Sequence, residues 1–327
     1  STSALTSSVN GGLGLDSITI GTGATVGFVN GGAGIDTITL QTGANVSTIV
    51  GGGLGDTISL ATAGLNGITI YGDGFGVTTS GTGTGGTADG ADQIGSSAVQ
   101  LASGASVYGA GGNDTIEFIG AAAVTGGGIL IDGGDGADTI NIQSSLNTAG
   151  STIFGGNGAD TLSFATAVGA ARLEGGNGQD SIFVNAASAL TIAGGAGVDT
   201  ILFTNTVTAA SNINGGSQGD AIYVGAAVSA GTALAAFNGG GTIAGGDGAD
   251  TIASLGFGHT GSINGGAGND SIVMGTAANL QWAANGTING GAGVDTVVLQ
   301  ASAGAGAAIG SANAITAGIA SIAYQAG

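Results

Sequence analysis

The 327-residue sequence contains no cysteine, no proline and no lysine, and Arg172 is its only arginine. Without cysteine, neither a disulfide framework nor a thiolate metal site can form. Proline cannot donate a backbone hydrogen bond to a sheet, so its absence suits a chain of paired strands. Twenty acidic residues give a net charge of −19, which excludes direct electrostatic binding of nucleic acid or anionic lipid and favours cations as partners.

Glycine is abundant instead, with 74 residues, and much of it recurs in one phrase. The segment Gly133–Ile140 reads G-G-x-G-x-D-x-U, where U is a large aliphatic residue, and the same phrase ends at Asp160 and Asp180. On this template thirteen aspartates are in register: Asp16, Asp36, Asp56, Asp92, Asp114, Asp138, Asp160, Asp180, Asp199, Asp220, Asp250, Asp270 and Asp295. The phrase is complete at nine of them and altered before Asp56, Asp92, Asp114 and Asp220.

Successive aspartates are separated by 20, 20, 36, 22, 24, 22, 20, 19, 21, 30, 20 and 25 residues. A repeat of about 20 residues indicates stacked coils of one solenoid, so we expect a single domain over residues 1–327. The longer gaps predict insertions near residues 77–87, 225–241 and 275–286, the last containing Trp282.

Apolar residues follow the aspartates with the period of a β-strand. The second residue after each aspartate is Ile, Leu or Val, and the fourth is mostly apolar as well. Another apolar residue lies two positions before the first glycine of the phrase, as at Ile131 and Ile153. We therefore predict an all-β fold, a right-handed parallel β-roll or β-helix solenoid of about 13–15 coils, with one calcium-binding glycine turn per coil.

Stacking places equivalent aspartates about 4.8 Å apart, where two charges repel by roughly 3.5 kcal/mol at an effective dielectric constant near 20. Cations between the carboxylates, or protons on several of them, would remove this repulsion. Carboxylates beside glycine-rich backbone carbonyls form an oxygen site that suits Ca²⁺, which accepts six to eight oxygens with loose geometry. Zinc lacks its usual sulfur and imidazole ligands here.

The glycine phrase resembles the RTX calcium-binding repeats, whose nonapeptide is G-G-x-G-x-D-x-U-x. The resemblance covers residues 9–299 and implies ions between adjacent turns, held by aspartates and backbone carbonyls. It implies that Asp138 and Asp160 flank one ion, with carbonyls near Gly133, Asp135, Gly156 and Gly158, and that Asp160 and Asp180 flank the next. Besides the thirteen aspartates, the implied metal-site residues are Gly133, Gly134, Asp135, Gly136, Gly155, Gly156, Asn157, Gly158, Gly175, Gly176, Asn177 and Gly178.

The return turn of each coil, for example residues 41–45, lacks the aspartate that RTX repeats carry in both halves of a coil. We therefore expect one column of calcium ions. One-sided, lysine-poor calcium repeats resemble the lattice-forming regions of bacterial S-layer proteins exported by type I secretion. This resemblance implies a structural protein at the extracellular surface of a Gram-negative bacterium, with calcium ions and copies of itself as partners.

Three alternatives remain open: a repeat segment of a larger type I-secreted adhesin, toxin or enzyme, an ice-binding solenoid, and a β-helix polysaccharidase. Threonine and serine alternate after Asp16, Asp36 and Asp56, as ice-binding ranks do, but later coils break the pattern. Asp132, Glu117 and Glu174 are the acids that a polysaccharidase would use. His259 and Arg172 belong to coils about four apart and cannot share a site, so we expect no enzyme.

The two ends of the sequence give two further expectations. Ser1 enters a repeat already under way, which suggests a mature or excised piece of a longer chain. The uncharged stretch 301–327 is rich in alanine, glycine and serine, which predicts further coils and no insertion into a membrane.

Overall fold

The structure is a computed structural model that describes residues 7–61, 65–74, 89–96, 101–119, 127–143, 146–147, 150–205, 207, 210–225, 241–254, 261–274, 281–282, 287–301, 308–309, 314–316 and 319–326. These residues form an all-β parallel β-solenoid, so the predicted fold class is confirmed. The chain divides into two compact units, unit 1 (residues 1–165) and unit 2 (residues 166–327). The single domain over 1–327 stays a prediction. The predicted insertion at 77–87 lies outside the described residues, as do most of those at 225–241 and 275–286.

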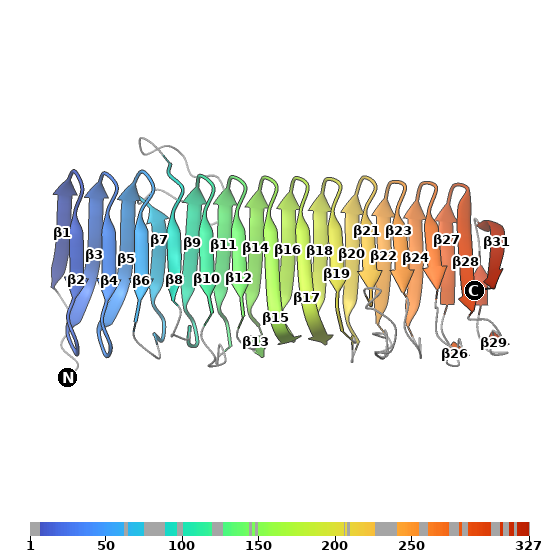
Figure 1. The fold of residues 1–327 in the computed structure, drawn as a ribbon, viewed down its shortest axis with the longest axis horizontal. Coiled ribbons are helices and arrows are strands. Elements are labelled where there is room, and N and C mark those ends of the chain that lie inside the picture. Colours follow the sequence, from blue (N-terminus) through green and yellow to red (C-terminus); the bar gives the residue numbers. More distant parts are fainter. Residues whose placement is uncertain are drawn as a thin grey trace. The chain divides into compact units, whose positions relative to one another are not determined.

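In unit 1 the chain alternates between two parallel sheets, sheet A and sheet B (Figure 1). Sheet A has the order β1 (Ser8–Leu13), β3 (Thr25–Ala33), β5 (Asn45–Gly53), β7 (Thr69–Asp73), β9 (Ser106–Gly111), β11 (Leu130–Asp135) and β14 (Thr152–Asn157). Sheet B has the order β2 (Ser17–Ile20), β4 (Thr37–Leu40), β6 (Thr57–Leu60), β8 (Gln93–Ser96), β10 (Thr115–Phe118), β12 (Thr139–Ile142) and β15 (Thr161–Gly169), and β13 (Leu146–Asn147) also pairs with β15.

Unit 2 repeats this arrangement. Its sheet A strands are β16 (Arg172–Asn177), β18 (Thr191–Ala196), β20 (Asn212–Ser217), β22 (Thr242–Asp247), β24 (Ser262–Ala267), β27 (Thr287–Ala292) and β30 (Ala314–Thr316). Its sheet B strands are β17 (Ser181–Ser188), β19 (Thr200–Phe203), β21 (Ala221–Val224), β23 (Thr251–Ser254), β25 (Ser271–Met274), β28 (Asp295–Ala301) and β31 (Ile319–Ala326). β26 (Gln281–Trp282) pairs with β29 (Ala308–Ile309). Within residues 301–327, β30 and β31 extend the two sheets, as the predicted further coils require.

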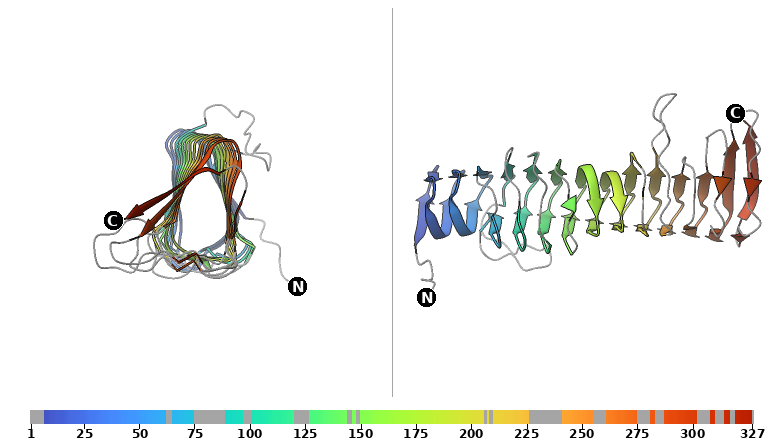
Figure 2. Two further views of the ribbon diagram at one scale, coloured as in Figure 1. Left: turned by 90° about the vertical axis from the view of Figure 1, so that its right-hand side faces the viewer. Right: turned by 90° about the horizontal axis from the view of Figure 1, so that it is seen from below.

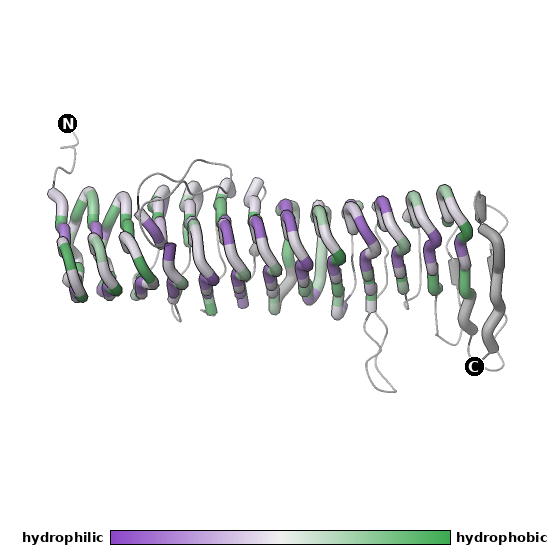
Figure 3. Tube along the Cα trace, turned by 90° about the horizontal axis from the view of Figure 1, so that it is seen from above, coloured by the Kyte–Doolittle hydropathy of each residue, from purple (hydrophilic) through white to green (hydrophobic). Residues whose placement is uncertain are grey.

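The apolar columns predicted from the sequence line the interior of each unit. Ile38, Ile140 and Ile201 in sheet B are fully buried, and so are Ile131 and Ile263 in sheet A. Seen along the coils, the two sheets form walls around this interior (Figure 2, left). Hydrophobic residues recur at the same places in successive coils of each unit (Figure 3). The parallel register explains this recurrence, because residues one repeat apart pair directly, as Ile116 does with Ile140.

The glycine phrase belongs partly to a strand, which differs from the expected turn. β11 continues through Gly133 and Gly134 to Asp135, and Gly134 pairs with Gly156 of the next coil. Backbone hydrogen bonds between phrases explain the difference, since the Gly136 amide donates to the Asn157 carbonyl oxygen at 2.7 Å. The chain therefore reverses only over the last residues of each phrase.

Glycine is favoured at the second and fourth phrase positions because the backbone there has a positive φ, for example +110° at Gly134 and +135° at Gly136. Where the phrase departs from glycine, Leu54, Ala110 and Gln218 adopt φ angles of 72°, 88° and 79°. These values lie nearer the left-handed region that L-residues can occupy. The altered phrases before Asp56, Asp114 and Asp220 thus keep the turn, at a cost of about 1–3 kcal/mol each.

Candidate functional site

The register-matched aspartates form one ladder in each unit, described here as the Asp ladder. Each backbone amide donates to Oδ1 of the aspartate in the next coil, as the Asp36 amide does to Asp56 at 2.7 Å. In unit 1 these bonds run unbroken from Asp16 to Asp160 at 2.6–2.8 Å. In unit 2 they run from Asp180 to Asp295 at 2.7–3.0 Å. The altered phrases do not interrupt either ladder.

The ladder side chains are buried. Asp16, in the first coil, is half-buried, and the other twelve are at most 3% exposed. Their second oxygen, Oδ2, is buried without a hydrogen-bond partner in Asp16, Asp36, Asp56, Asp92, Asp114, Asp138, Asp199, Asp220, Asp250, Asp270 and Asp295. Leaving a buried carboxylate oxygen unpaired is costly, so each of these atoms requires a partner that the chain itself does not supply.

A backbone carbonyl oxygen lies on the same side of the coil as Oδ2. A Cβ added to Gly31, the first glycine of its phrase, would lie 2.5 Å from Asp36 Oδ2 and 2.3 Å from the Gly51 carbonyl oxygen. In unit 2 a Cβ on Gly194 would lie 2.5 Å from Asp199 Oδ2 and 2.3 Å from the Gly215 oxygen. Both kinds of oxygen are hydrogen-bond acceptors, so neither can donate to the other, whereas a proton or a cation could contact both. The same crowding explains why the first position is glycine.

Burial raises the pKa of nine ladder carboxyls, although the amide donated by the preceding aspartate opposes the shift. The pKa reaches about 9 at Asp92 and about 8 at Asp114, where neighbouring carboxylates raise it further. It reaches about 7 at Asp56, Asp160 and Asp220 and about 6 at Asp138, and it is also raised at Asp199, Asp250 and Asp270. Near neutral pH these raised pKa values favour protonated carboxyls, and the ladder could hold metal ions in place of the protons.

Asp73 adds a carboxylate that the sequence pattern did not mark as a site residue. It is 5% exposed and accepts hydrogen bonds from the Gly111 amide at 3.3 Å and the Gly90 amide at 3.4 Å. Burial raises its pKa to about 7, and its charge raises the pKa of Asp92 and Asp114. It pairs with Gly52 at the second phrase position, where the other phrases carry glycine or alanine, so an acidic residue at that position was the available signal.

The oxygen atoms around the ladder fit a hard cation such as Ca²⁺ if backbone carbonyl oxygens also act as ligands. Among the described residues, no group of three or more His, Cys, Asp or Glu side chains is placed to hold a metal ion. An ion at the ladder would therefore need backbone carbonyl oxygens as well as Oδ2 atoms. Ca²⁺ accepts such mixed oxygen ligands, whereas zinc prefers nitrogen and sulfur. The stacked buried aspartates are thus compatible with metal binding.

Comparison with known proteins supplies no identity for the chain: no protein-family model matches the sequence, and no curated protein matches it either. The parallel solenoid and its Asp ladder are established by the coordinates alone. The RTX and S-layer resemblances remain interpretations of the glycine phrase.

The predicted ligands in the central phrases have different surroundings. Asp135 Oδ1 accepts a hydrogen bond from Asn157 Nδ2 at 2.6 Å, so these two third-position side chains bind each other. The Asn157 carbonyl oxygen accepts the Gly136 amide. A carbonyl oxygen has two lone pairs, so the Asn157 oxygen could still contact an ion.

The acids considered for catalysis are not brought together in unit 1. Glu117 lies on β10 in sheet B, where its Oε1 accepts a hydrogen bond from Asn141 Nδ2 at 2.8 Å. Asp132 lies on β11 in sheet A, and burial, followed by the charge of Asp135, raises its pKa. In unit 2, Glu174 pairs with Arg172 at 2.5 Å. His259 lies outside the described residues.

No helix among the described residues has the length and apolar character needed to cross a membrane. The extended structure within 301–327 agrees with the expectation of strands there.

Proposed function

We propose that this chain is a structural calcium-binding protein of the S-layer type, which folds with Ca²⁺ outside the cell and assembles with copies of itself into a surface lattice. One observation carries the proposal: in both units, buried aspartates present an unpartnered Oδ2 atom beside a backbone carbonyl oxygen of the next coil. Bound Ca²⁺ would supply the missing positive charge at each such place.

The residues that would hold the ions are the ladder aspartates together with carbonyl oxygens of the glycine phrases. In unit 1, Asp138 and Asp160 with the phrases Gly133–Gly136 and Gly155–Gly158 are the model case. Ions that bind only to the folded state raise the free energy of unfolding. Once the ion concentration exceeds the dissociation constant, this gain grows with the logarithm of the concentration. Extracellular calcium modules have dissociation constants of about 0.1–1 mM, a range that suits a protein folding outside the cell.

A structural role at the surface of a Gram-negative bacterium is consistent with the composition. The chain has no cysteine, one arginine and no lysine, so neither disulfides nor basic patches are available for stability or binding. The three candidate acids lie apart from one another within unit 1 or are held by an arginine in unit 2, which favours a protein without catalytic activity. The net charge of −19 also makes divalent cations a requirement for close packing of copies.

A calcium titration of the metal-free chain tests both parts of the proposal. Circular dichroism should change from coil to β-sheet as Ca²⁺ rises through the millimolar range, and electron microscopy should then show ordered arrays. Excess EGTA at pH 8 should reverse both changes, whereas Mg²⁺ at the same concentration should not replace Ca²⁺. A β-sheet spectrum unchanged by EGTA would contradict calcium-dependent folding. Folding without arrays would contradict the lattice role alone.

A further inference from the structure

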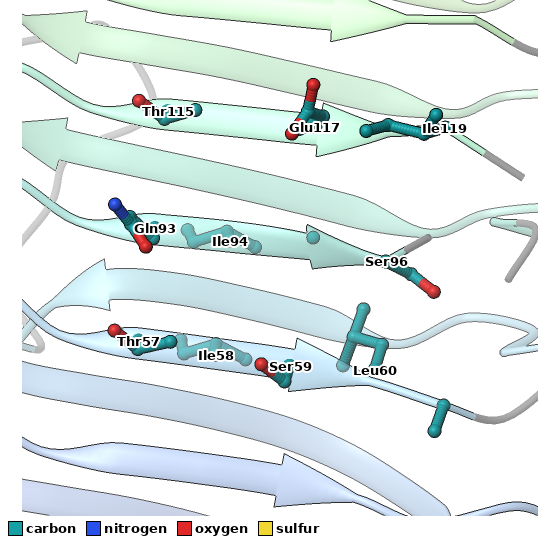
Figure 4. Close-up of a pocket in the computed structure, with 12 residues that line it drawn as sticks. Thr57, Ile58, Ser59, Leu60, Gln93, Ile94, Ser96, Thr115, Glu117 and Ile119 are labelled. Carbon is teal, nitrogen blue, oxygen red and sulfur yellow. The ribbon is translucent and has the colours of Figure 1, made fainter. Parts of the chain in front are cut away.

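A groove of about 430 Å³ crosses the outer face of sheet B in unit 1 (Figure 4). It spans β6, β8 and β10, and it lies on a different surface from the Asp ladder, whose carboxylates are buried. Its polar side chains are Thr57, Ser59, Gln93, Ser96, Thr115 and Glu117, and its apolar lining is Ile58, Leu60, Ala61, Ile94 and Ile119.

The groove exists because β8 carries small residues where its neighbours carry larger ones. Gly95 pairs with Ser59 on one side and Glu117 on the other, so no side chain fills the middle of this row. Ser96 pairs with Phe118, and it stands in the column where the other coils of unit 1 have Leu, Ile or Phe. The hollow is thus a local departure from the repeat, built into one strand.

The groove presents hydroxyl, amide and carboxylate groups in fixed rows. Parallel register sets Thr57, Gln93 and Thr115 in one row, one strand apart from each other. The carboxylate of Glu117 is oriented by the hydrogen bond from Asn141 to its Oε1. Ile119, which is 37% exposed, adds an apolar surface at one end.

This lining selects against most ligand classes. It contains one carboxylate and no lysine, arginine or histidine, so it repels phosphates, nucleic acids and acidic sugars. Its polar rows disfavour a purely apolar ligand, because the hydroxyls would lose their bonds to water. It lacks the three acidic or imidazole ligands that would favour a bare metal ion, in agreement with the described residues as a whole.

A neutral polyhydroxylated ligand matches the lining. Sugar hydroxyls both donate and accept hydrogen bonds. They can therefore donate to the Glu117 carboxylate, and they can donate to or accept from the Gln93 amide and the threonine hydroxyls. The C–H face of a sugar ring can pack on Ile119, and the volume suits a short oligosaccharide. We propose that this groove binds a neutral oligosaccharide.

The groove should bind a saccharide without cleaving it. Glycoside hydrolysis uses two carboxyl groups on either side of the scissile bond, about 5–10 Å apart. Among the residues lining the groove, Glu117 is the only acid, and Asp132 belongs to the other sheet. The proposal does not depend on calcium, except that the chain must be folded.

The test uses the full chain in Ca²⁺, with its fold checked by circular dichroism in every sample. Neutral trisaccharides of glucose, mannose and N-acetylglucosamine, and a trigalacturonate as the acidic counterpart, are titrated by calorimetry and by saturation-transfer NMR. We expect at least one neutral trisaccharide to bind and the trigalacturonate not to bind.

Two variants locate the binding to the groove. Ser59→Phe should fill the hollow and weaken binding at least about tenfold, and Glu117→Gln, which can still accept from Asn141, should weaken it by about the same factor. Thr19→Phe is the matched control, because Thr19 is exposed in the same row two coils away and outside the groove. Failure of all three neutral trisaccharides to bind the folded protein would overturn the proposal, as would equal losses in Ser59→Phe and Thr19→Phe.

Discussion

The outward positions of sheet B differ between the two units although their interiors agree. In unit 1 the third residue after the ladder aspartate is Thr19, Thr39 or Ser59 in the first three coils, whereas in unit 2 it is Phe183, Leu202 or Tyr223. Phe183 and Leu202 are half-buried and Tyr223 is 36% exposed, so they form a partly accessible apolar row across β17, β19 and β21. The repeat constrains the residues inside the coil and leaves the side chains of the outer face free to differ.

The ladders differ in a second way. Burial is the main cause of the raised pKa at Asp92 and Asp114 in unit 1 and at Asp199 in unit 2, but at Asp92 and Asp114 the charge of Asp73 raises the pKa further. The long coil between Asp56 and Asp92, which contains Asp73, therefore adds negative charge to the unit 1 ladder, and this charge favours bound protons or cations. Four experiments test what the two units share and where they differ, in order of decreasing expected effect.

Alanine at the second phrase position should damage both units equally. A Cβ at Gly32 would lie 2.0 Å from the Gly12 carbonyl oxygen, and one at Gly195 would lie 2.0 Å from the Gly176 oxygen. The control Gly12→Ala has a similar positive φ but meets nothing within 4 Å, so it should cost only the backbone strain of about 1–3 kcal/mol. Gly32→Ala and Gly195→Ala should lower the urea midpoint well beyond Gly12→Ala. If Gly195→Ala behaved like the control, the two interiors would not be equivalent.

The metal-free chain should lose stability as the pH rises. Because the folded-state pKa of several ladder carboxyls is raised from 3.8 to about 6–9, the folded chain binds more protons than the unfolded chain over this range. Stability should therefore be greatest near pH 4 and fall through pH 9, and saturating Ca²⁺ should weaken this dependence. Thermal unfolding at pH 4.5 and 8.5, with and without Ca²⁺, checks the sign. A higher midpoint at pH 8.5 in metal-free protein would refute it.

Asparagine in the ladder should stabilise metal-free protein, more in unit 1 than in unit 2. Asn keeps the Oδ1 acceptor, is neutral without taking up a proton, and offers an amide donor near the neighbouring carbonyl oxygen. At pH 8 without metal, where we expect the unchanged chain to be mostly coil, Asp92→Asn should shift the folding equilibrium toward the folded state by about 1–3 kcal/mol, seen as a gain of β-sheet circular dichroism, and Asp199→Asn should shift it by less. In Ca²⁺ both should lose bound ions, measured by elemental analysis of the dialysed protein.

Asp73→Asn is the control for that difference. It removes the extra charge near Asp92 without changing the ladder hydrogen bonds, so it should lower the pKa of Asp92 and Asp114. Carboxyl titration by NMR measures this effect. If the pKa of both residues stayed unchanged, Asp73 would not be the cause of the difference between the two units.

The smallest effect on stability is expected for the apolar row of unit 2. Leu202→Ser combined with Tyr223→Ser should leave the calcium-loaded chain folded but abolish ordered arrays, because an exposed apolar row favours contact with another copy. Thr19→Ala combined with Thr39→Ala in unit 1 is the control and should leave arrays intact. Arrays that persist in the first pair would exclude this row as the contact.

The sequence by itself determined the repeat, the direction of the side chains and the existence of the ladder. Aspartates at a constant spacing, with isoleucine two residues later, predict stacked strands because one coil period brings identical residues into register. The burial of Ile38, Ile131 and Ile201 follows from the same period.

Only the tertiary structure decided how each carboxylate is used. Contacts between coils place the amide of one aspartate on Oδ1 of the next, leave Oδ2 against a glycine, and bring Asp73 to Gly111, 38 residues away. They also hold Leu54 and Gln218 at positive φ where glycine is missing, and leave a groove at Gly95. These features depend on atoms in neighbouring coils, whose packing a local sequence pattern does not specify.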